Sequence, residues 1–241
     1  MVEVDLAEIW TYLAETPLIW LTATLLAYVA GDSLAQASGR KPAVNPVLIA
    51  VILLALVLWL TATPYAVYFE GAKFVHFLLG PATVALAVPM YAYLPQVRRA
   101  ALPIVAALIA GSATAVATAV GIAWAFGLRG EILASIAPKG VTAPVALGIS
   151  EALGGSPTLT AVLVILTGII GAIVVTPLLN ALGVKDWRAR GLSVGVAAHG
   201  IGTARAFQVH PRAGAFAGIG MGLNAILTAF LAPWILGLFT G

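Results

Sequence analysis

Long intervals without a charged residue constrain this chain more than any other feature of its sequence. Five intervals contain no Asp, Glu, Lys or Arg: residues 42–69, 74–97, 100–128, 152–184 and 213–241. Each is longer than the roughly 20 residues that one transmembrane helix needs. A sixth candidate covers residues 16–37 and carries a single charge, Asp32. The pattern predicts an all-α integral membrane protein with about six transmembrane helices.

The composition excludes a water-soluble fold and several classes of site. Of the 241 residues, 61% are hydrophobic and 9% are charged, whereas soluble domains carry roughly 25% charged residues. The absence of cysteine excludes a disulfide framework, a thiolate nucleophile and Cys-based metal sites. The formal net charge of +3 is explained by basic cytoplasmic loops, so it does not predict nucleic-acid binding.

Two segments between the long intervals are interrupted too often by charges to cross the membrane as whole helices. Residues 131–155 and 190–212 hold only short charge-free runs. Backbone at membrane depth is helical unless protein encloses it, so such runs suit re-entrant or broken helices. We predict an external hairpin at 131–155 and a cytoplasmic hairpin at 190–212, oriented toward each other. The alternative is that either segment crosses as an unwound helix, which adds a span and moves the C-terminus.

The basic residues orient the predicted helices. Lys and Arg concentrate in cytoplasmic loops, and eight of the 12 fall on one side if both termini are outside: Arg40, Lys41, Arg98, Arg99, Lys185, Arg188, Arg190 and Arg212. The acidic segment 1–15 is predicted to form a short interfacial helix. We expect residues 1–241 to form a single transmembrane domain in the inner (plasma) membrane of the cell.

A weak internal repeat relates the two predicted hairpins. The run GVTAP at 140–144 aligns with GVAAH at 195–199, and Pro177 aligns with Pro233 at a similar offset. One hairpin plus one crossing helix, placed twice in tandem, inverts its second copy, as in many secondary transporters. We therefore expect an inverted-repeat, transporter-like arrangement.

Small residues predict where helices approach each other closely. In the last span, three glycines are spaced four residues apart: Gly214, Gly218 and Gly222. Small residues at this spacing let two helix backbones come into contact in lipid. We expect these glycines to form a helix-packing face.

The external hairpin carries a candidate anion site. Its run PKGVTAP at 138–144 contains Lys139 and Thr142, at the start of a predicted returning helix. The free N–H groups and positive dipole end of that helix, together with the ammonium and hydroxyl groups, suit a carboxylate ligand. The alternative for Lys139 is that its long side chain extends to the membrane surface.

The cytoplasmic hairpin carries a second candidate set. In the run HGIGTAR at 199–205, Gly200 and Gly202 are predicted to free the backbone for a turn, and Thr203 to cap the next helix. Arg205 offers a planar fork for a carboxylate, so it needs either an anionic substrate or an ion pair with Glu151. His199 titrates near neutral pH in its free form, so proton coupling and a structural hydrogen bond are both open.

Neither an enzyme nor a metal site is expected. The metalloprotease motif His-Glu-x-x-His is absent, and the three histidines, at 76, 199 and 210, lack metal-ligand spacing. We predict no catalytic residue, no metal and no cofactor.

Five motifs, in this order, resemble the LrgB/CidB family. They are Asn45-Pro46, LLGPATVALA at 78–87, PKGVTAPVA at 138–146, LTA at 159–161 with LTGIIG at 166–171, and AHGIGTARA at 198–206. The resemblance covers the chain from about Asn45 to the C-terminus. Where the family usually has Ser and Thr, this chain has Gly140 and Ala143. A binding role of those two side chains is therefore in doubt, but not one of Lys139 or Thr142.

The resemblance implies two functions. Bacterial members are named antiholin-like, as modulators of murein hydrolase export and lysis that work beside a small LrgA/CidA-type membrane protein. Plastid members resemble this chain in their second half and exchange glycolate for glycerate, and bacterial pairs are linked to pyruvate. Opposed hairpins with a Lys and an Arg are superfluous in a holin, so we favour a carrier of small 2-hydroxy- or 2-oxo-monocarboxylates. Partners would be the carboxylate, the bilayer, an LrgA/CidA-type protein and further copies of the chain.

The orientation predicts the reactivity of introduced thiols. Single cysteines at Ala37 and Ala181, in a chain with no native cysteine, should react with an impermeant maleimide only from the cytoplasmic face. The measurement is labelling of intact cells against inverted vesicles. Labelling of either position in intact cells contradicts this topology.

Overall fold

The computed structural model describes residues 16–85 and 87–240, and the regular elements in these ranges are all helices. The all-α prediction is confirmed. The chain divides into two compact units, Met1–Ala85 and Leu86–Gly241, while the single transmembrane domain stays a prediction. The predicted interfacial helix at 1–15 lies outside the described residues.

The described part of the first unit, residues 16–85, contains three helices, α2 (Pro17–Ala37), α3 (Pro46–Leu60) and α4 (Tyr65–Ala85). Helix α2 packs on both others. Glycines make this packing close, because a Cβ on Gly31 would meet the backbone of Pro46, and one on Gly71 would lie 2.7 Å from Trp20 Cβ.

The turn between the second and third helices is not where the charges predicted it. Glu70 and Lys73 were expected to lie between two spans, but they form an ion pair inside α4. The chain turns instead between α3 and α4, where Ala62 has a φ of 51° and Pro64 precedes the first turn of α4. The predicted span 74–97 is accordingly divided between α4, α5 (Ala87–Ala92) and α6 (Leu94–Arg99).

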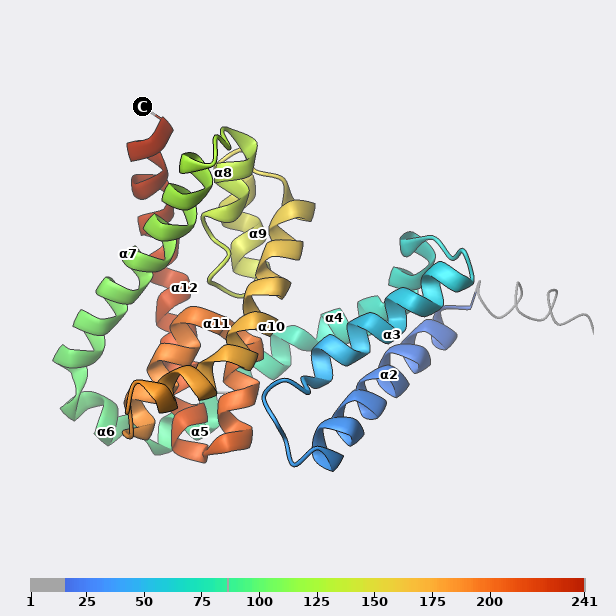
Figure 1. Ribbon diagram of the computed structural model, residues 1–241, viewed down its shortest axis with the longest axis horizontal. Coiled ribbons are helices and arrows are strands. Elements are labelled where there is room, and N and C mark those ends of the chain that lie inside the picture. Colours follow the sequence, from blue (N-terminus) through green and yellow to red (C-terminus); the bar gives the residue numbers. More distant parts are fainter. Residues whose placement is uncertain (1–15, 86, 241) are drawn as a thin grey trace, which may run out of the picture. The chain divides into compact units, whose positions relative to one another are not determined.

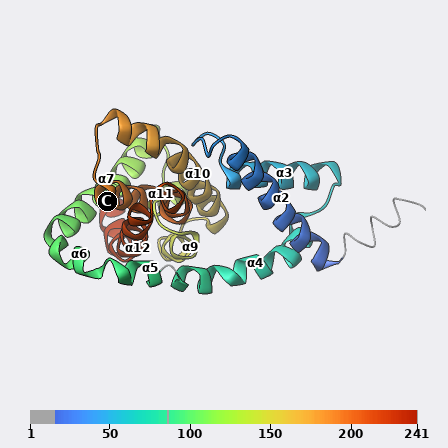
Figure 2. The ribbon, with the colours of Figure 1, turned by 90° about the horizontal axis from the view of Figure 1, so that it is seen from below.

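The second unit continues with six more helices (Figure 1): α7 (Ala101–Ala125), α8 (Glu131–Ile136), α9 (Ala143–Ala152), α10 (Pro157–Ala181), α11 (Trp187–Val209) and α12 (Pro211–Thr240). Within the unit, α8 and α9 lie at one end and α11 lies at the other (Figure 1). Helices α11 and α12 lie side by side in both views (Figures 1 and 2).

Four of the described helices are long and apolar enough to cross a membrane, namely α2, α7, α10 and α12. Helix α3 is apolar but has 15 residues, and α4 contains the Glu70–Lys73 pair. Large apolar side chains such as Leu102, Phe230 and Trp234 are exposed on this set, as expected of surfaces in lipid. The chain is therefore a membrane protein, while the predicted count of six spans stays a prediction.

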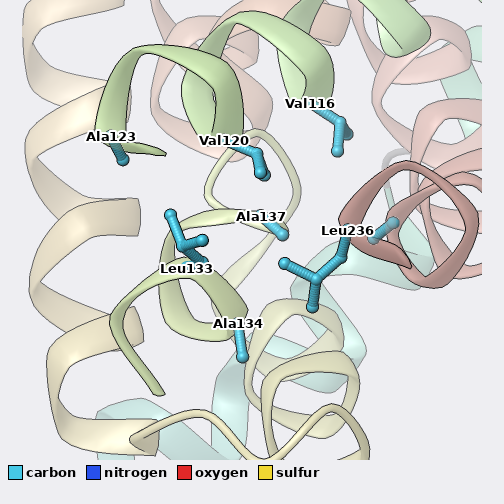
Figure 3. Close-up of a cluster of buried hydrophobic side chains, with 8 residues drawn as sticks. Val116, Val120, Ala123, Leu133, Ala134, Ala137 and Leu236 are labelled. Carbon is cyan, nitrogen blue, oxygen red and sulfur yellow. The ribbon is translucent and has the colours of Figure 1, made fainter. Parts of the chain in front are cut away.

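A chain reversal between α7 and α10 forms what we call the first hairpin, made of α8, the turn at 137–142, and α9. Its outer part is held by a buried cluster in which side chains of α7, α8 and α12 converge, including Val120, Leu133 and Leu236 (Figure 3). Ser150 on α9 accepts a hydrogen bond from Thr160 on α10 (2.7 Å between the oxygens). The two arms therefore return to the same end of the unit.

Helix α11 also reverses, and we call its two arms, residues 187–198 and 200–209, the second hairpin. His199 between them has φ 39° and ψ −133°, which no helix accommodates. A straight helix of this length would be about 34 Å long, yet the rings of Trp187 and His210 at its ends stack with centroids 4.7 Å apart. The second arm therefore lies back along the first.

Glycines seat the second hairpin on α12. A Cβ added to Gly191 or Gly195 would overlap the carbonyl oxygens of Ala213 or Ala217. The predicted face of Gly214, Gly218 and Gly222 contributes less, because Gly214 meets the Phe207 ring while Gly222 has nothing within 4 Å. The close helix contact is thus made by a GxxxG pair on α11 facing alanines, which the sequence analysis did not single out.

This packing predicts that glycine-to-alanine substitutions at two positions affect the stability differently. Gly195→Ala should lower the free energy of unfolding by about 1–3 kcal/mol, because the new methyl group overpacks the contact with Ala217. Gly222→Ala, with open space around it, is the matched control and should be neutral. Thermal unfolding in detergent measures both. Equal melting temperatures for the two variants contradict the backbone contact.

Candidate functional site

The tips of the two hairpins meet at the middle of α12. The side-chain amide of Asn224 donates one hydrogen bond to the carbonyl oxygen of Gly140 and another to that of Val196, both 3.1 Å long. Gly140 belongs to the turn of the first hairpin, and Val196 lies three residues before the break of the second. Asn224 is 2% exposed. Two segments that enter the unit from opposite ends therefore share one buried partner.

The amide oxygen of Asn224 is bonded as well. It accepts from the hydroxyl of Ser112 on α7 (2.5 Å) and from that of Thr228 on α12 (3.3 Å). Both hydroxyls are buried. A polar network thus crosses an otherwise apolar interior and joins α7, α12 and both hairpins.

His199 forms the tip of the second hairpin and faces α10. It is 4% exposed, and its Nε2 lies 3.0 Å from the carbonyl oxygen of Val164. Glycine makes room for the ring, because a Cβ on Gly168 would lie 2.6 Å from His199 Cε1. The ring therefore has a structural hydrogen bond, which was one of the two roles expected for it.

The turn of the second hairpin is made differently from the prediction. Gly200 and Gly202 were expected to supply it, but the residue with positive φ is His199. Gly202 instead allows close packing, since its Cβ would lie 2.9 Å from Val194 Cγ1. Thr203 was expected to cap the second arm, whereas its hydroxyl donates to the carbonyl oxygen of His199 (2.7 Å). The hydroxyl thus supplies a donor to the carbonyl at the break.

Lys139 and Thr142 lie in and beside the turn of the first hairpin. Both side chains are half-buried, and Thr142 is the residue before α9, although its side chain makes no capping bond. Lys139 precedes Gly140, which shares the amide of Asn224 with Val196, three residues before His199. The structure therefore brings Lys139 and His199, from the two predicted sets, to one region.

Arg205 lies elsewhere, in a crevice between the arms of the second hairpin and α10. The crevice is lined by Thr176, Trp187, Arg190 and Arg205, among others, and its free volume of about 20 Å³ is that of roughly one water molecule. Arg205 Nη1 donates to Gln208 Oε1 at 3.4 Å. Glu151, the predicted partner of Arg205, is exposed on α9. Its neighbour Ser150 is bonded to Thr160 near the start of α10, whereas Thr176, which lines the crevice of Arg205, lies near the end of α10. That length of helix, about 24 Å, separates the two charges.

Arg190 in the same crevice has a structural role. It is 9% exposed, and its guanidinium donates to the carbonyl oxygen of Val184 and to Asn180 Oδ1, both at 2.8 Å. Its charge also lies over the Trp187 ring, 5.2 Å from the centroid. Arg190 thus fastens the start of α11 to the end of α10.

A groove between α7 and the first arm of α11 leads from the basic end of the unit toward the hairpin tips. Its wider part, about 490 Å³, is lined by Arg99, Asp186, Arg188, Ser193 and apolar residues. A narrower part shares Leu192 and Ser193 with it and reaches Val196. At the basic end, hydrogen bonds from Arg188 lower the pKa of Asp186 to about 2, so the carboxylate stays ionised beside the guanidinium.

Two chemistries are not assembled in the described part of the chain. The described residues contain no cluster of three or more His, Asp or Glu suited to a metal ion. The run from Gly191 to Gly195 fits the letters Gly-x-Ser-x-Gly, which marks a nucleophile only at a strand–turn–helix junction. Here Ser193 lies inside α11 and its hydroxyl donates to the carbonyl oxygen of Ala189 (2.8 Å).

The sequence analysis missed Asn224 and Ser112. Asn224 is the one amide side chain in the charge-free interval 213–241. Polar groups inside membrane segments are expensive to bury, so they mark structural or functional sites. An amide in this interval therefore carries such a signal, although it has no formal charge.

Comparison with known proteins gives consistent matches over nearly the whole chain. The model of the LrgB-like family matches residues 24–238. The holin-like protein CidB of Staphylococcus epidermidis is 32% identical over 228 residues, covering 95% of this chain and 98% of that protein. CidB of Staphylococcus aureus is 31% identical over 222 residues, with 92% and 96% covered. YwbG of Bacillus subtilis, an uncharacterised protein, is 34% identical over 221 residues, with 91% and 97% covered. No solved structure matches the chain.

Truncation of the side chains of Arg188 and Arg190, both near the start of α11, should lower the stability of the protein by different amounts. Arg190→Ala should lower the free energy of unfolding by about 1.5–3 kcal/mol, because it leaves the Val184 carbonyl and Asn180 without their charged donor. Arg188→Ala removes only an exposed ion pair with Asp186 and should lower the stability much less, because water screens such pairs. Chemical denaturation in detergent compares them, and a larger loss for Arg188→Ala contradicts the assignment.

Proposed function

Because the chain belongs to the LrgB-like family of membrane proteins, we propose that it carries small 2-hydroxy- or 2-oxo-monocarboxylates across the membrane by alternating access. The substrate class of glycolate, glycerate and pyruvate follows from the family resemblance. The two opposed hairpins, with their tips at the middle of α12, are the observation that favours transport.

The opposed hairpins support a carrier more than a pore-forming or regulatory role. Helix interruptions inside membrane proteins are expensive, and they are tolerated where they line a path or a binding site. A holin needs apolar helices that associate, and continuous helices suffice for that. Buried breaks at His199 and at the turn of Gly140, both close to Asn224, have no purpose in such an assembly.

The charged groups provide a route for an anion in this proposal. Arg99 and the Arg188–Asp186 ion pair line the groove at the end that we assign to the cytoplasm, where the charge of Arg99 raises the local concentration of anions. Lys139 and the region around His199 provide the binding site at the hairpin tips. The 20 Å³ now free in the crevice of Arg205 is too small for a carboxylate ligand. In this proposal, movement of the second hairpin widens the crevice, and Arg205 then holds the substrate carboxylate.

The alternative is an antiholin-like regulator of murein hydrolase export and lysis, which acts through an LrgA/CidA-type partner and transports nothing. The printed name of the Staphylococcus relatives, holin-like protein, favours it. A regulator of this kind needs association surfaces but no route for a solute.

Uptake into proteoliposomes separates the two functions. Vesicles that contain the purified chain should take up more labelled glycolate or pyruvate than protein-free vesicles. Uptake is measured with and without an LrgA/CidA-type partner, and unlabelled substrate should compete with the labelled one. Leakage of a trapped dye is measured on the same vesicles. Dye leakage without saturable carboxylate uptake contradicts the carrier and favours the holin-like function.

The role proposed for Arg205 predicts how far a conservative substitution weakens carboxylate binding. Lysine keeps the charge but loses the bidentate fork, and one charge-assisted hydrogen bond is worth roughly 1.5–3 kcal/mol. Arg205→Lys should therefore weaken carboxylate binding about 10- to 150-fold, measured by substrate-induced thermal stabilisation. Arg188→Lys, an exposed arginine of the same helix, is the matched control. Unchanged affinity in Arg205→Lys removes Arg205 from the binding site.

A further inference from the structure

We propose that Asn224 is a positioning residue that holds the tips of both hairpins together, so that one tip does not move away from α12 without the other. The proposal concerns how the two hairpins are coupled and therefore goes beyond the proposed function. It rests on the two hydrogen bonds from one buried amide to Gly140 and Val196.

The two carbonyl groups need this partner because of where the backbone breaks. In a helix, the carbonyl of Val196 would accept from the N–H of Gly200, but the positive φ of His199 interrupts that series. Gly140 lies in a turn between two helices. Both sites are enclosed by apolar side chains such as Val141 and Phe216, and an unpaired buried carbonyl is costly.

Asparagine fits this position for a chemical reason. Its side chain has two N–H donors and an oxygen with two acceptor positions, and all four are used here. Ser112 and Thr228 donate to the oxygen, which turns the NH₂ group toward the two carbonyls. Aspartate has the same size but at most one donor, when its carboxyl group is protonated, and leucine has neither donors nor acceptors.

One group that satisfies both carbonyls couples the two hairpins. If the first tip withdraws, the amide keeps its bond to the second tip, yet the Gly140 carbonyl loses its donor, and the reverse holds for Val196. Removal of Asn224 should therefore loosen both tips at once, although Gly140 and Val196 belong to segments that enter from opposite ends of the unit (Figure 1).

Thiol labelling tests the coupling in the purified chain, independently of transport. Single cysteines replace Val141 beside the first tip and Val196 at the second, which are 1% and 7% exposed. A third replaces Val120, 0% exposed in the cluster of α7, α8 and α12, as the control. Labelling rates with a small maleimide are measured with Asn224 intact and with Asn224→Leu.

We expect labelling at 141 and 196 to rise at least about tenfold in Asn224→Leu, because loss of two hydrogen bonds shifts the opening equilibrium by that factor or more. Labelling at 120 should stay unchanged. A rise at only one tip, or at neither, overturns the proposal. If all three rates rise, Asn224→Asp decides, since it keeps the size of the side chain and a carboxyl group, ionised or protonated, cannot donate to both carbonyls. Wild-type protection of both tips in that variant overturns the proposal.

These outcomes are distinguishable from failure of the proposed function. Coupled exposure of the tips in a chain that takes up no carboxylate contradicts transport and leaves the positioning role in place. Normal uptake by the wild-type protein, together with tips whose exposure does not change jointly on loss of Asn224, contradicts the positioning role and leaves transport in place.

Discussion

Backbone carbonyl groups that lose their helical partners inside a membrane protein need another donor, because lipid offers none. Much of the second unit follows from this requirement. The amide of Asn224 serves the carbonyl groups of Val196 and Gly140. It reaches Val196 because α11 lies close to α12, and the glycines at 191 and 195 make that approach sterically possible.

The sequence predicted the class of fold and the places where it is irregular, because both follow from the spacing of charges. Turn positions at 61–64 and at His199 were missed for a different reason. A Glu70–Lys73 pair inside α4 is neutral as a unit, so two charges close together did not mark a loop. At the second hairpin, glycine was assumed to make the turn, whereas a histidine with a bonded ring adopts the unusual φ.

The candidate site was predicted in its residue types but not in its arrangement. Lys139 and His199 lie in one region, as the facing hairpins implied, while Arg205 lies nearer the open end of the second hairpin. The predicted cap at Thr203 put the start of the second arm two residues before Arg205, although the break is at His199, six residues before it. Asn224 was invisible to an argument based on formal charge, since its importance comes from donors that only the folded chain brings to Gly140 and Val196.

The contact between α11 and α12 repeats along its own length. Gly191 faces Ala213 and Gly195 faces Ala217, one turn further along both helices. A slide of α11 by about four residues, roughly 6 Å, would set Gly195 against Ala213 but would bring His199 opposite Ala217 and move Gly191 past the start of α12. Glycine therefore meets alanine at both contacts in one register only. The hydrogen bond from Asn224 to Val196 belongs to that same register.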